Sequence, residues 1–356
     1  MILLNPGPVT LSNRVRNALS GPDLCHREEE FGLLQQSIRD KLLGVYNLSN
    51  ENWAPVLLTG SGTAAVEAML ISCIPEEGQT LVIENGVYGE RMSEMLKSYA
   101  INYDRHTNEW GANIDINSLR VMLSKKQYSH AVLVHHETTT GRLNELSEIS
   151  ELCARYGTKL LVDAVSSFGA EAIPFENETI AACAATANKC LHGVPGTSFV
   201  LLRRSLFKDT MAPRRSVYLD LFKYLKAQDG EGTPFTQSVQ SFYALEEALK
   251  EFFDQGGRKS RYEIYKQRML KISDVLNSLR IKPFLPSNVN SVVLRSFLLP
   301  SAKTYEEVHR SLKTQGFIIY AGQNQYRDKL FRISLMGDIS NKDLSDLEFA
   351  LGKTFS

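Results

Sequence analysis

Residues 131–163 of the chain read AVLVHHETTTGRLNELSEISELCARYGTKLLVD. The apolar runs at Ala131–His135 and Lys159–Asp163 have the length of buried strands, and Glu145–Tyr156 between them has the periodicity of a helix. Two strands joined through a helix of about a dozen residues pair in parallel. This stretch therefore predicts a βαβ unit and, with it, an α/β fold.

The alternation of strands and helices continues on both sides of this unit. The predicted strands are 56–59, 80–84, 183–187 and 198–202, and the predicted helices are 62–74 and 88–99. After about residue 205 we predict a polar loop at 214–233 and then two long helices at 236–253 and 258–279. A shorter α/β tail follows, with strands at 291–295, 317–320 and 331–335 and helices at 305–315 and from 342. We expect a large domain with a mostly parallel sheet over residues 1–280 and a smaller C-terminal α/β domain over residues 281–356.

The overall composition excludes several classes of protein. The chain has 356 residues, with 40 Lys and Arg against 40 Asp and Glu, so its formal net charge is zero. Nucleic-acid-binding proteins usually carry a basic excess, so we expect no such partner. No apolar run approaches the roughly 18 residues of a membrane-spanning helix, and the N-terminus lacks the basic start of an export signal. The five cysteines are scattered without a CxxC pair, which favours reduced thiols and a cytoplasmic location.

The first candidate site is Thr59-Gly60-Ser61-Gly62-Thr63-Ala64-Ala65, where a strand turns into a helix. Glycines let the backbone approach an anion, and the helix N-terminus favours phosphate, so this stretch predicts a phosphate-binding turn. The same residues also fit the dinucleotide pattern GxGxxA, with Glu84 ending the next strand. A helix start that binds nothing is the third interpretation.

Two further positions combine with this turn. Asp163 ends an apolar strand, where ligands of α/β proteins bind, although such a residue can also cap a helix or form a turn. Lys189 follows the small apolar run Ala181–Ala187 and precedes a Gly/Pro-rich loop, so its amine either lies in a cleft with a lowered pKa or points to solvent. Pyridoxal phosphate needs a lysine, a carboxylate for its ring nitrogen and a helix N-terminus for its phosphate. A dehydrogenase has no use for the lysine and the aspartate.

With these residues the chain resembles the class V pyridoxal-phosphate aminotransferases. The blocks that carry the resemblance are LLNPGPVT (3–10), LLTGSGTAAVEA (57–68), HHETTTG (135–141), LLVDAVSSFGA (160–170), ANKCLHGVPG (187–196), RSVYLDL (215–221), QGFIIYAG (315–322) and FRISLMG (331–337). The resemblance covers essentially the whole chain. It implies the fold-type-I transferase architecture and pyridoxal 5′-phosphate as cofactor. It is strongest to members that convert 2-aminoethylphosphonate and pyruvate to phosphonoacetaldehyde and L-alanine.

The resemblance also implies roles for individual residues. Lys189 would bond covalently to the cofactor and move the proton, and Asp163 would hold the ring nitrogen. The other cofactor contacts would be Ser61, Gly62 and Thr63 at the phosphate, Tyr88 stacked on the ring and Thr138 near the ring hydroxyl. Thr233 and Thr236 would reach the phosphate of a neighbouring subunit, which implies a homodimer with shared active sites.

For the substrates, the resemblance assigns Arg332 to the carboxylate of pyruvate or alanine, where a guanidinium gives a bidentate grip. Arg215 is a candidate for the phosphonate group, against a plain surface charge. His26 and Arg27 are candidates for the mouth of the site, against a solvated helix start. His135 and His136 look like part of a metal cluster, but adjacent strand residues face opposite sides, so we expect no metal.

Several alternatives stay open on the sequence alone. An alanine–glyoxylate or serine–pyruvate aminotransferase would share the cofactor site. A nucleotide-binding dehydrogenase built on GxGxxA and a cofactor-binding regulator without turnover are the alternatives from other classes. The physiological direction is also open, and the segment CHREEEF (25–31) makes a biosynthetic role one of the hypotheses.

Overall fold

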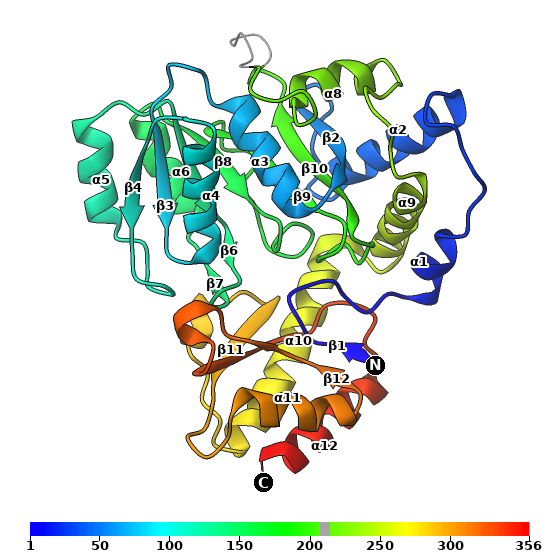
Figure 1. Cartoon of the computed structure of the whole chain (residues 1–356), viewed down its shortest axis with the longest axis vertical. Coiled ribbons are helices and arrows are strands. Elements are labelled where there is room, and N and C mark those ends of the chain that lie inside the picture. The colour runs from blue at the N-terminus through cyan, green and yellow to red at the C-terminus, as the bar shows by residue number, and fades with distance from the viewer. Residues whose placement is uncertain (207–213, 356) are drawn as a thin grey trace.

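A computed structural model describes residues 1–206 and 214–355. Over these residues the chain forms a large body around a seven-stranded sheet and a smaller body beneath it, as Figure 1 shows. The spatial order of the large sheet is β2-β10-β9-β8-β5-β3-β4. These strands span Trp53–Gly60 (β2), Thr80–Glu84 (β3), Tyr103–Thr107 (β4), His130–Val134 (β5), Lys159–Asp163 (β8), Ile180–Thr186 (β9) and Gly196–Arg203 (β10).

The direction of the strands decides where a ligand can bind. The pairs among β4, β3, β5, β8 and β9 are parallel, whereas β10 is antiparallel to both β9 and β2. β2 therefore runs in the same direction as β9. The carboxyl ends of β2, β3, β5, β8 and β9 all meet at one edge of the sheet, which is where ligands of α/β proteins bind.

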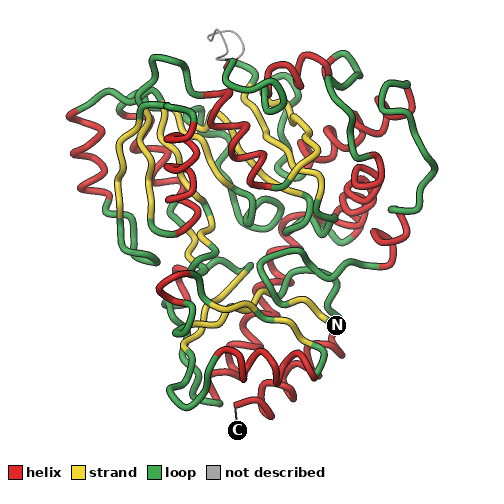
Figure 2. Tube along the Cα trace, viewed as in Figure 1, coloured by secondary structure: helices red, strands yellow, loops and turns green. Residues whose placement is uncertain are grey.

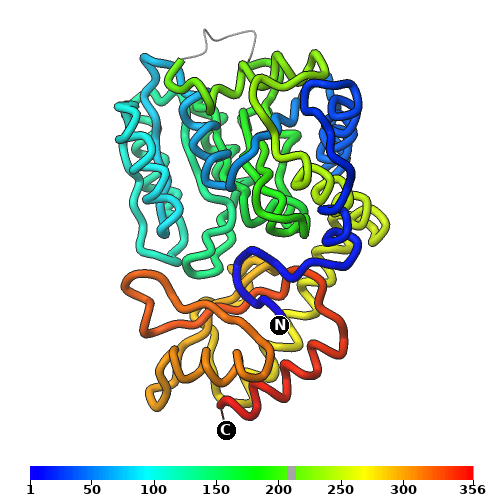
Figure 3. The backbone as a smooth tube through the Cα atoms, turned by 45° about the vertical axis from the view of Figure 1, so that its right-hand side comes forward, coloured from blue at the N-terminus to red at the C-terminus, as the bar shows by residue number. Residues whose placement is uncertain are grey.

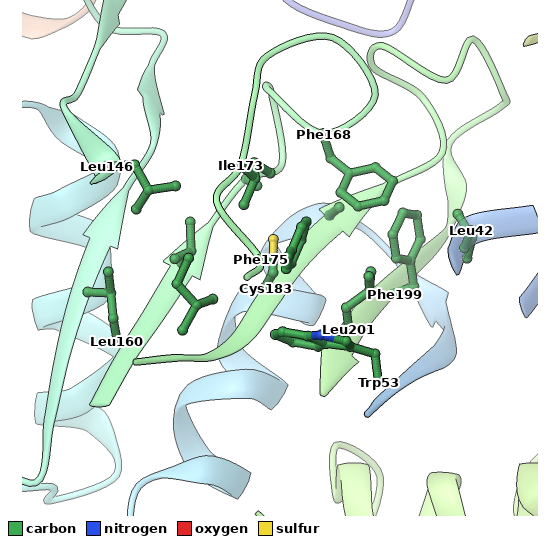
Figure 4. Packing of buried hydrophobic residues seen from close by; sticks show 14 of the residues in the cluster. Leu42, Trp53, Leu146, Leu160, Phe168, Ile173, Phe175, Cys183, Phe199 and Leu201 are labelled. Carbon is green, nitrogen blue, oxygen red and sulfur yellow. The ribbon is translucent and has the colours of Figure 1, made fainter. Parts of the chain in front are cut away.

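Helices cover both faces of this sheet, so its strands are apolar on both sides (Figure 2). On β2, Trp53 and Leu57 enter one buried cluster while Ala54, Val56 and Leu58 enter the other, as the alternation of a strand requires. Figure 4 shows Trp53, Phe199 and Leu201 packed together in the first cluster. The helices on that face are α2 (Glu29–Gly44), α5 (Ile116–Lys125), α6 (Leu146–Arg155) and α9 (Val239–Asp254), and those on the other face are α3 (Gly62–Cys73), α4 (Val87–Ser98) and α8 (Leu221–Asp229).

The smaller body has its own sheet and buried cluster. Its antiparallel sheet has the order β11-β14-β13, and a short parallel pair joins β1 to β12. Leu4 belongs to this cluster, as do Met269, Ile272 and Leu276 from the second half of α10. Both segments fall within the range 1–280 predicted for the large domain. The elements are β1 (Ile2–Leu3), α10 (Gly257–Ser278), η1 (Ser287–Val289), β11 (Leu294–Leu298), α11 (Tyr305–Thr314), β12 (Phe317–Ile318), β13 (Tyr320–Ala321), η2 (Asn324–Tyr326), β14 (Leu330–Ser334) and α12 (Asn341–Phe355).

Most predicted elements lie within a few residues of the observed ones, but three departures have physical causes. The stretch 214–233 is not a loop throughout, because α8 buries Leu221, Tyr224 and Leu225 and Asp220 caps its N-terminus. The predicted strand 317–320 is split, since β12 pairs with β1 and β13 pairs with β14. The elements without a sequence-based prediction include α1 (Asn13–Ala18), β4, α5 and the hairpin of β6 (His136–Glu137) and β7 (Arg142–Leu143).

A half-buried histidine joins the two bodies three residues after the candidate lysine. The Nε2 atom of His192 accepts a hydrogen bond from the Gly337 N–H at 2.8 Å and lies 2.5 Å from the Tyr265 hydroxyl. A backbone N–H can only donate, so Nε2 is an acceptor and the Tyr265 O–H donates to it as well. Burial, together with Arg261 and Arg268, holds the pKa of His192 well below its ordinary value, which keeps the ring neutral.

Replacing His192 by Leu should therefore destabilise the protein. The buried Gly337 N–H and Tyr265 O–H lose their acceptor, and each unsatisfied group costs about 1–3 kcal/mol. Tyr265→Phe removes only one of the two donors and should cost less. Urea unfolding of both variants measures the difference. His192→Asn serves as a control, because Asn tolerates the left-handed backbone at this position (φ +64) but is too short for the contact. A loss from His192→Leu no larger than that from Tyr265→Phe would contradict the assignment.

Candidate active site

The phosphate-binding turn lies where β2 ends and α3 begins. Ser61 is the N-cap of α3, and its hydroxyl accepts a hydrogen bond from the Ala64 N–H at 3.4 Å. The first N–H groups of a helix have no partner within the helix, and the helix dipole adds positive potential there. Gly62 and Thr63 in this first turn line a small cavity together with Tyr88 and Asp163. The turn thus has the geometry of an anion-binding site and shares its cavity with the Asp163 carboxylate.

Asp163 is the last residue of β8 and is almost fully buried, with 7% of its surface exposed. Within the described residues its carboxylate accepts one hydrogen bond, from the Val165 N–H at 2.9 Å. Burial raises the pKa of Asp163 to about 6, although Arg91 and Lys189 favour the ionised form. A carboxylate with so few partners favours a cation or a charged N–H group beside it.

Lys189 follows β9 at the same edge of the sheet. Its Nζ donates a hydrogen bond to the Pro6 carbonyl, 183 positions earlier in the chain. Burial lowers the pKa of Lys189 to about 8, and the charge of Arg332 acts in the same direction while Asp163 opposes it. The uncharged amine is therefore far more populated at neutral pH than in an ordinary lysine, which is what a nucleophilic amine needs.

Tyr88 lies at the start of α4, after β3, and a buried glutamate holds that helix start in place. The Glu137 carboxylate accepts hydrogen bonds from the backbone N–H groups of Tyr88 (3.2 Å) and Gly89 (3.3 Å), and from the Thr139 hydroxyl (2.6 Å). Burial raises the pKa of Glu137 to about 7. The guanidinium carbon of Arg91 lies 4.7 Å from the centroid of the Tyr88 ring.

Glu137 and Arg91 belong to the site but carry no predicted role from the sequence. Glu137 was quoted inside the HHETTTG block, and Arg91 is one helical turn after Tyr88. The trace that Glu137 leaves in the sequence is the glycine at position 86. A Cβ at Gly86 would come within 2.3 Å of the glutamate side chain, so the position needs a glycine. Both residues support Tyr88 and the cavity beside Asp163.

Arg332 reaches this region from the smaller body. It lies on β14 with 4% of its surface exposed. Its Nε donates to the Ala321 carbonyl and its Nη1 to the Thr138 carbonyl, both at 2.8 Å. Within the described residues no hydrogen bond uses Nη2, so this group is available to an anion. The structure thus brings Arg332 and Thr138 together.

Five predicted residues lie elsewhere in the single chain. Arg215 donates to the carbonyls of Ile71, Ile74 and Pro75, at the opposite end of α3 from Gly62. A helix of 12 residues is about 18 Å long, and its negative C-terminal end attracts a cation, so Arg215 is not brought to the substrate side of this chain. His26 and Arg27 precede α2, and among the described residues neither has a hydrogen bond to the cluster.

The remaining two, Thr233 and Thr236, lie between α8 and α9. The Thr233 hydroxyl donates to the Phe235 carbonyl at 3.1 Å, and the Thr236 side chain is exposed. Their neighbour Gln237 contacts the Thr59 hydroxyl at 2.9 Å, which places this segment beside the phosphate-binding turn of its own chain.

The described residues were also compared with the requirements of a metal site and of a membrane-spanning helix. Across residues 1–206 and 214–355, His, Cys, Asp and Glu side chains do not gather in groups of three that could hold a metal ion. No helix in these ranges is long and apolar enough to cross a membrane.

The helix N-terminus, Asp163 and Lys189 each suit a different part of pyridoxal 5′-phosphate. The N-terminus of α3 suits the phosphate, and the poorly partnered Asp163 suits a protonated ring nitrogen. Lys189, which has a lowered pKa, provides the amine that the cofactor aldehyde requires. Tyr88, Arg91 and Val165 line the cavity between these groups.

Removing the charge of Asp163 should stabilise the protein in the absence of ligand. Because the folded-state pKa is raised from 3.8 to about 6, the ionised form costs folding free energy, and this cost grows as pH rises through that window. Asp163→Asn should therefore raise the free energy of unfolding at pH 7.5 by up to about 3 kcal/mol, and by little at pH 4. Urea unfolding at both pH values measures this, with the exposed Asp328→Asn as the control. An equal effect at both pH values would contradict the electrostatic cause.

The comparisons with known proteins agree with this geometry. The family model described as aminotransferase class-V matches residues 14–347. A 2-aminoethylphosphonate–pyruvate transaminase of Bacillus cereus (strain Q1) is 32% identical over 356 residues, which cover 99% of this chain and 97% of that protein. A protein of the same name from Bacillus anthracis has the same identity and coverage.

Solved structures give the same fold. An aspartate aminotransferase from Thermus thermophilus superposes with a TM-score of 0.90 at 25% identity, covering 100% of this chain and 99% of that chain. An alanine–glyoxylate aminotransferase from Nostoc sp. gives a TM-score of 0.92 at 24% identity, covering 100% and 95%. These likenesses confirm the predicted fold-type-I architecture. Together with the match over most of its length, they show that the chain belongs to the class-V aminotransferase family and is a pyridoxal 5′-phosphate-dependent transaminase.

Proposed function

We propose that this transaminase acts in phosphonate metabolism and moves the amino group of 2-aminoethylphosphonate to pyruvate, giving phosphonoacetaldehyde and L-alanine. The observation that supports the proposal is the buried Arg332 guanidinium, which donates to the Ala321 and Thr138 carbonyls and whose Nη2 has no hydrogen-bond partner among the described residues. A substrate held by an anionic group at Arg332 would present its amine or carbonyl carbon to Lys189. The name of the relatives that match over the full chain supports this pair of substrates.

In this proposal each residue of the site has a separate role in binding the cofactor or in moving the proton. The cofactor, when bound, supplies an aldehyde that takes up the amino group and a cationic ring that withdraws electrons. Asp163 holds the ring nitrogen and stays ionised beside its charge, since a cation lowers the pKa of a carboxylate. The first turn of α3 binds the phosphate, and Tyr88 packs on the ring. Lys189 takes the proton from the amine-bearing carbon of the donor and returns one to the acceptor, as an intramolecular base and acid.

An alanine–glyoxylate or serine–pyruvate exchange is the second candidate. The fold is shared with the Nostoc enzyme, and a buried guanidinium with a free Nη2 also suits the carboxylate of glyoxylate or serine. The two candidates differ in the anion at the donor end, which is a phosphonate in one case and a carboxylate in the other.

We also propose a homodimer with shared active sites, working in the cytoplasm. Val217 and Tyr218 are exposed apolar side chains with 75% and 41% of their surface accessible. The Tyr218 hydroxyl donates to the Thr59 carbonyl at 3.0 Å, so this patch adjoins the phosphate-binding turn. A second copy seated there would bring Thr233 and Thr236 toward the other copy's phosphate. The cysteines of the described chain, all free thiols, suit a reducing compartment.

A substrate panel tests the reaction. With pyruvate as acceptor, the purified holoenzyme should use 2-aminoethylphosphonate at least about tenfold more efficiently than serine or glutamate as donor, because roughly 1.4 kcal/mol of preferential binding suffices for that factor. Lys189→Ala should abolish transamination. Measuring kcat/KM in both directions separates a biosynthetic role from a degradative one. Equal use of all donors, or activity that survives in Lys189→Ala, would reject the proposal.

Arg332→Gln provides a test of the substrate-anion site. We expect it to raise KM for pyruvate and alanine by roughly 10- to 100-fold, because a charged hydrogen-bonded contact is worth about 1.5–3 kcal/mol. The half-reaction with 2-aminoethylphosphonate should change less. Stopped-flow measurement of each half-reaction shows the two effects separately. Equal damage to both halves would reject the specific assignment of Arg332 to the carboxylate.

A further inference from the structure

Residues 5–8, Asn5-Pro6-Gly7-Pro8, form a strap across the Lys189 side chain. The Pro6 carbonyl accepts a hydrogen bond from Lys189 Nζ. Gly7 lies flat against the lysine, since a Cβ at this position would come within 2.6 Å of its Cδ and 2.9 Å of its Cε and Nζ. Gly7 has φ +116, and its N–H donates to the Asn5 side-chain oxygen at 3.1 Å. Only a glycine combines this backbone with so close an approach.

The strap is fixed at both ends to the smaller body. Leu4, which precedes the strap, is fully buried in the smaller body. Its N–H donates a hydrogen bond to the Ile318 carbonyl at 2.7 Å. Just after it, the Thr10 carbonyl accepts a hydrogen bond from the Asp338 N–H at 2.8 Å. Figure 3 shows this N-terminal segment passing between the two bodies. The strap is therefore held by the smaller body while it contacts the lysine of the larger one.

The same anchors lead to the strand of Arg332. The Ser334 N–H donates to the Leu4 carbonyl at 2.8 Å, and Ser334 lies two residues from Arg332 on β14. Residues two apart on a strand point to the same face. A short run of backbone thus connects the proposed substrate-anion site to the amine of Lys189.

We propose that the strap positions the free amine of Lys189 for proton transfer and for condensation with the cofactor aldehyde. A neutral amine has two N–H groups and one lone pair. When the Pro6 carbonyl accepts one N–H, rotation about the Cε–Nζ bond is restricted, and the directions of the remaining N–H and the lone pair are restricted with it. A proline carbonyl suits this role, because the residue has no N–H that competes for a partner. Pro6 and Gly7 act through Lys189, so they are positioning residues; the proton-transfer part of the proposal rests on the proposed function.

Gly7→Ala tests the strap, with Gly316→Ala as a matched control. Both glycines have positive φ (+116 and +95), so both variants carry backbone strain. A Cβ at Gly316 meets no atom within 4 Å, whereas one at Gly7 collides with Lys189. The difference between the variants therefore isolates the contact with the lysine.

The main readout uses apoprotein and needs no amino-group substrate. Condensation of Lys189 with the aldehyde of pyridoxal 5′-phosphate releases one water and is followed by absorbance and fixed by borohydride. We expect Gly7→Ala to slow this capture by roughly 10- to 100-fold, since a misplacement of about 1 Å can cost that much. Gly316→Ala should stay within about twofold of the unaltered protein. Affinity for pyridoxamine 5′-phosphate, which has no aldehyde, should remain unchanged in Gly7→Ala.

Asn5→Ala supplies a second variant that adds no atoms. It removes the acceptor of the Gly7 N–H and should slow capture by a smaller factor. Unchanged capture in both Gly7→Ala and Asn5→Ala would overturn the proposal. An equal loss of pyridoxamine 5′-phosphate affinity would overturn it as well, because the strap would then build the cofactor site instead of positioning the lysine. A protein that captures the cofactor normally but fails the substrate panel would refute the proposed function and leave the capture test of the strap intact.

Discussion

The burial of opposite charges at one edge of a parallel sheet is the constraint on which this structure depends. Asp163 ends β8 and is buried, and Lys189 follows the neighbouring strand β9 and is half-buried. Burial raises the pKa of the acid and lowers that of the amine, so both charged forms are disfavoured. A cationic ring beside the carboxylate and a covalent bond at the amine relieve both penalties, which makes this edge a place for a reactive cofactor.

Sheet topology alone brings several of the predicted site residues to the same edge. Ser61, Tyr88, Thr138, Asp163 and Lys189 follow β2, β3, β5, β8 and β9, and strands that run in one direction deliver their following residues to one edge. The sequence does not reveal that the Arg215 guanidinium satisfies the carbonyl end of α3. Nor does it reveal the pairing of β1 with β12, which joins segments more than 300 positions apart.

Contacts of long sequence separation also explain the residues that the analysis left without a role. Glu137 holds the helix start of Tyr88 from 48 and 49 positions away, and Pro6 meets Lys189 across 183 positions. Local propensity contains no information about such pairs. The glycines do leave a trace in the sequence, since Gly7 and Gly86 are the points where the backbone must approach Lys189 and Glu137 without a side chain.

Two links tie the smaller body to the lysine from opposite directions. His192 continues the lysine loop into Gly337, and the strap returns from Leu4 to Lys189. Gly337 packs on the Thr10 backbone, since a Cβ at this position would come within 2.7 Å of the Thr10 carbonyl oxygen, so the two links meet. β14, which bears Arg332, joins the strap where the Ser334 N–H donates to the Leu4 carbonyl. Arg332 and the Lys189 amine therefore belong to one hydrogen-bonded frame, since the strap's Pro6 carbonyl accepts from Lys189 Nζ.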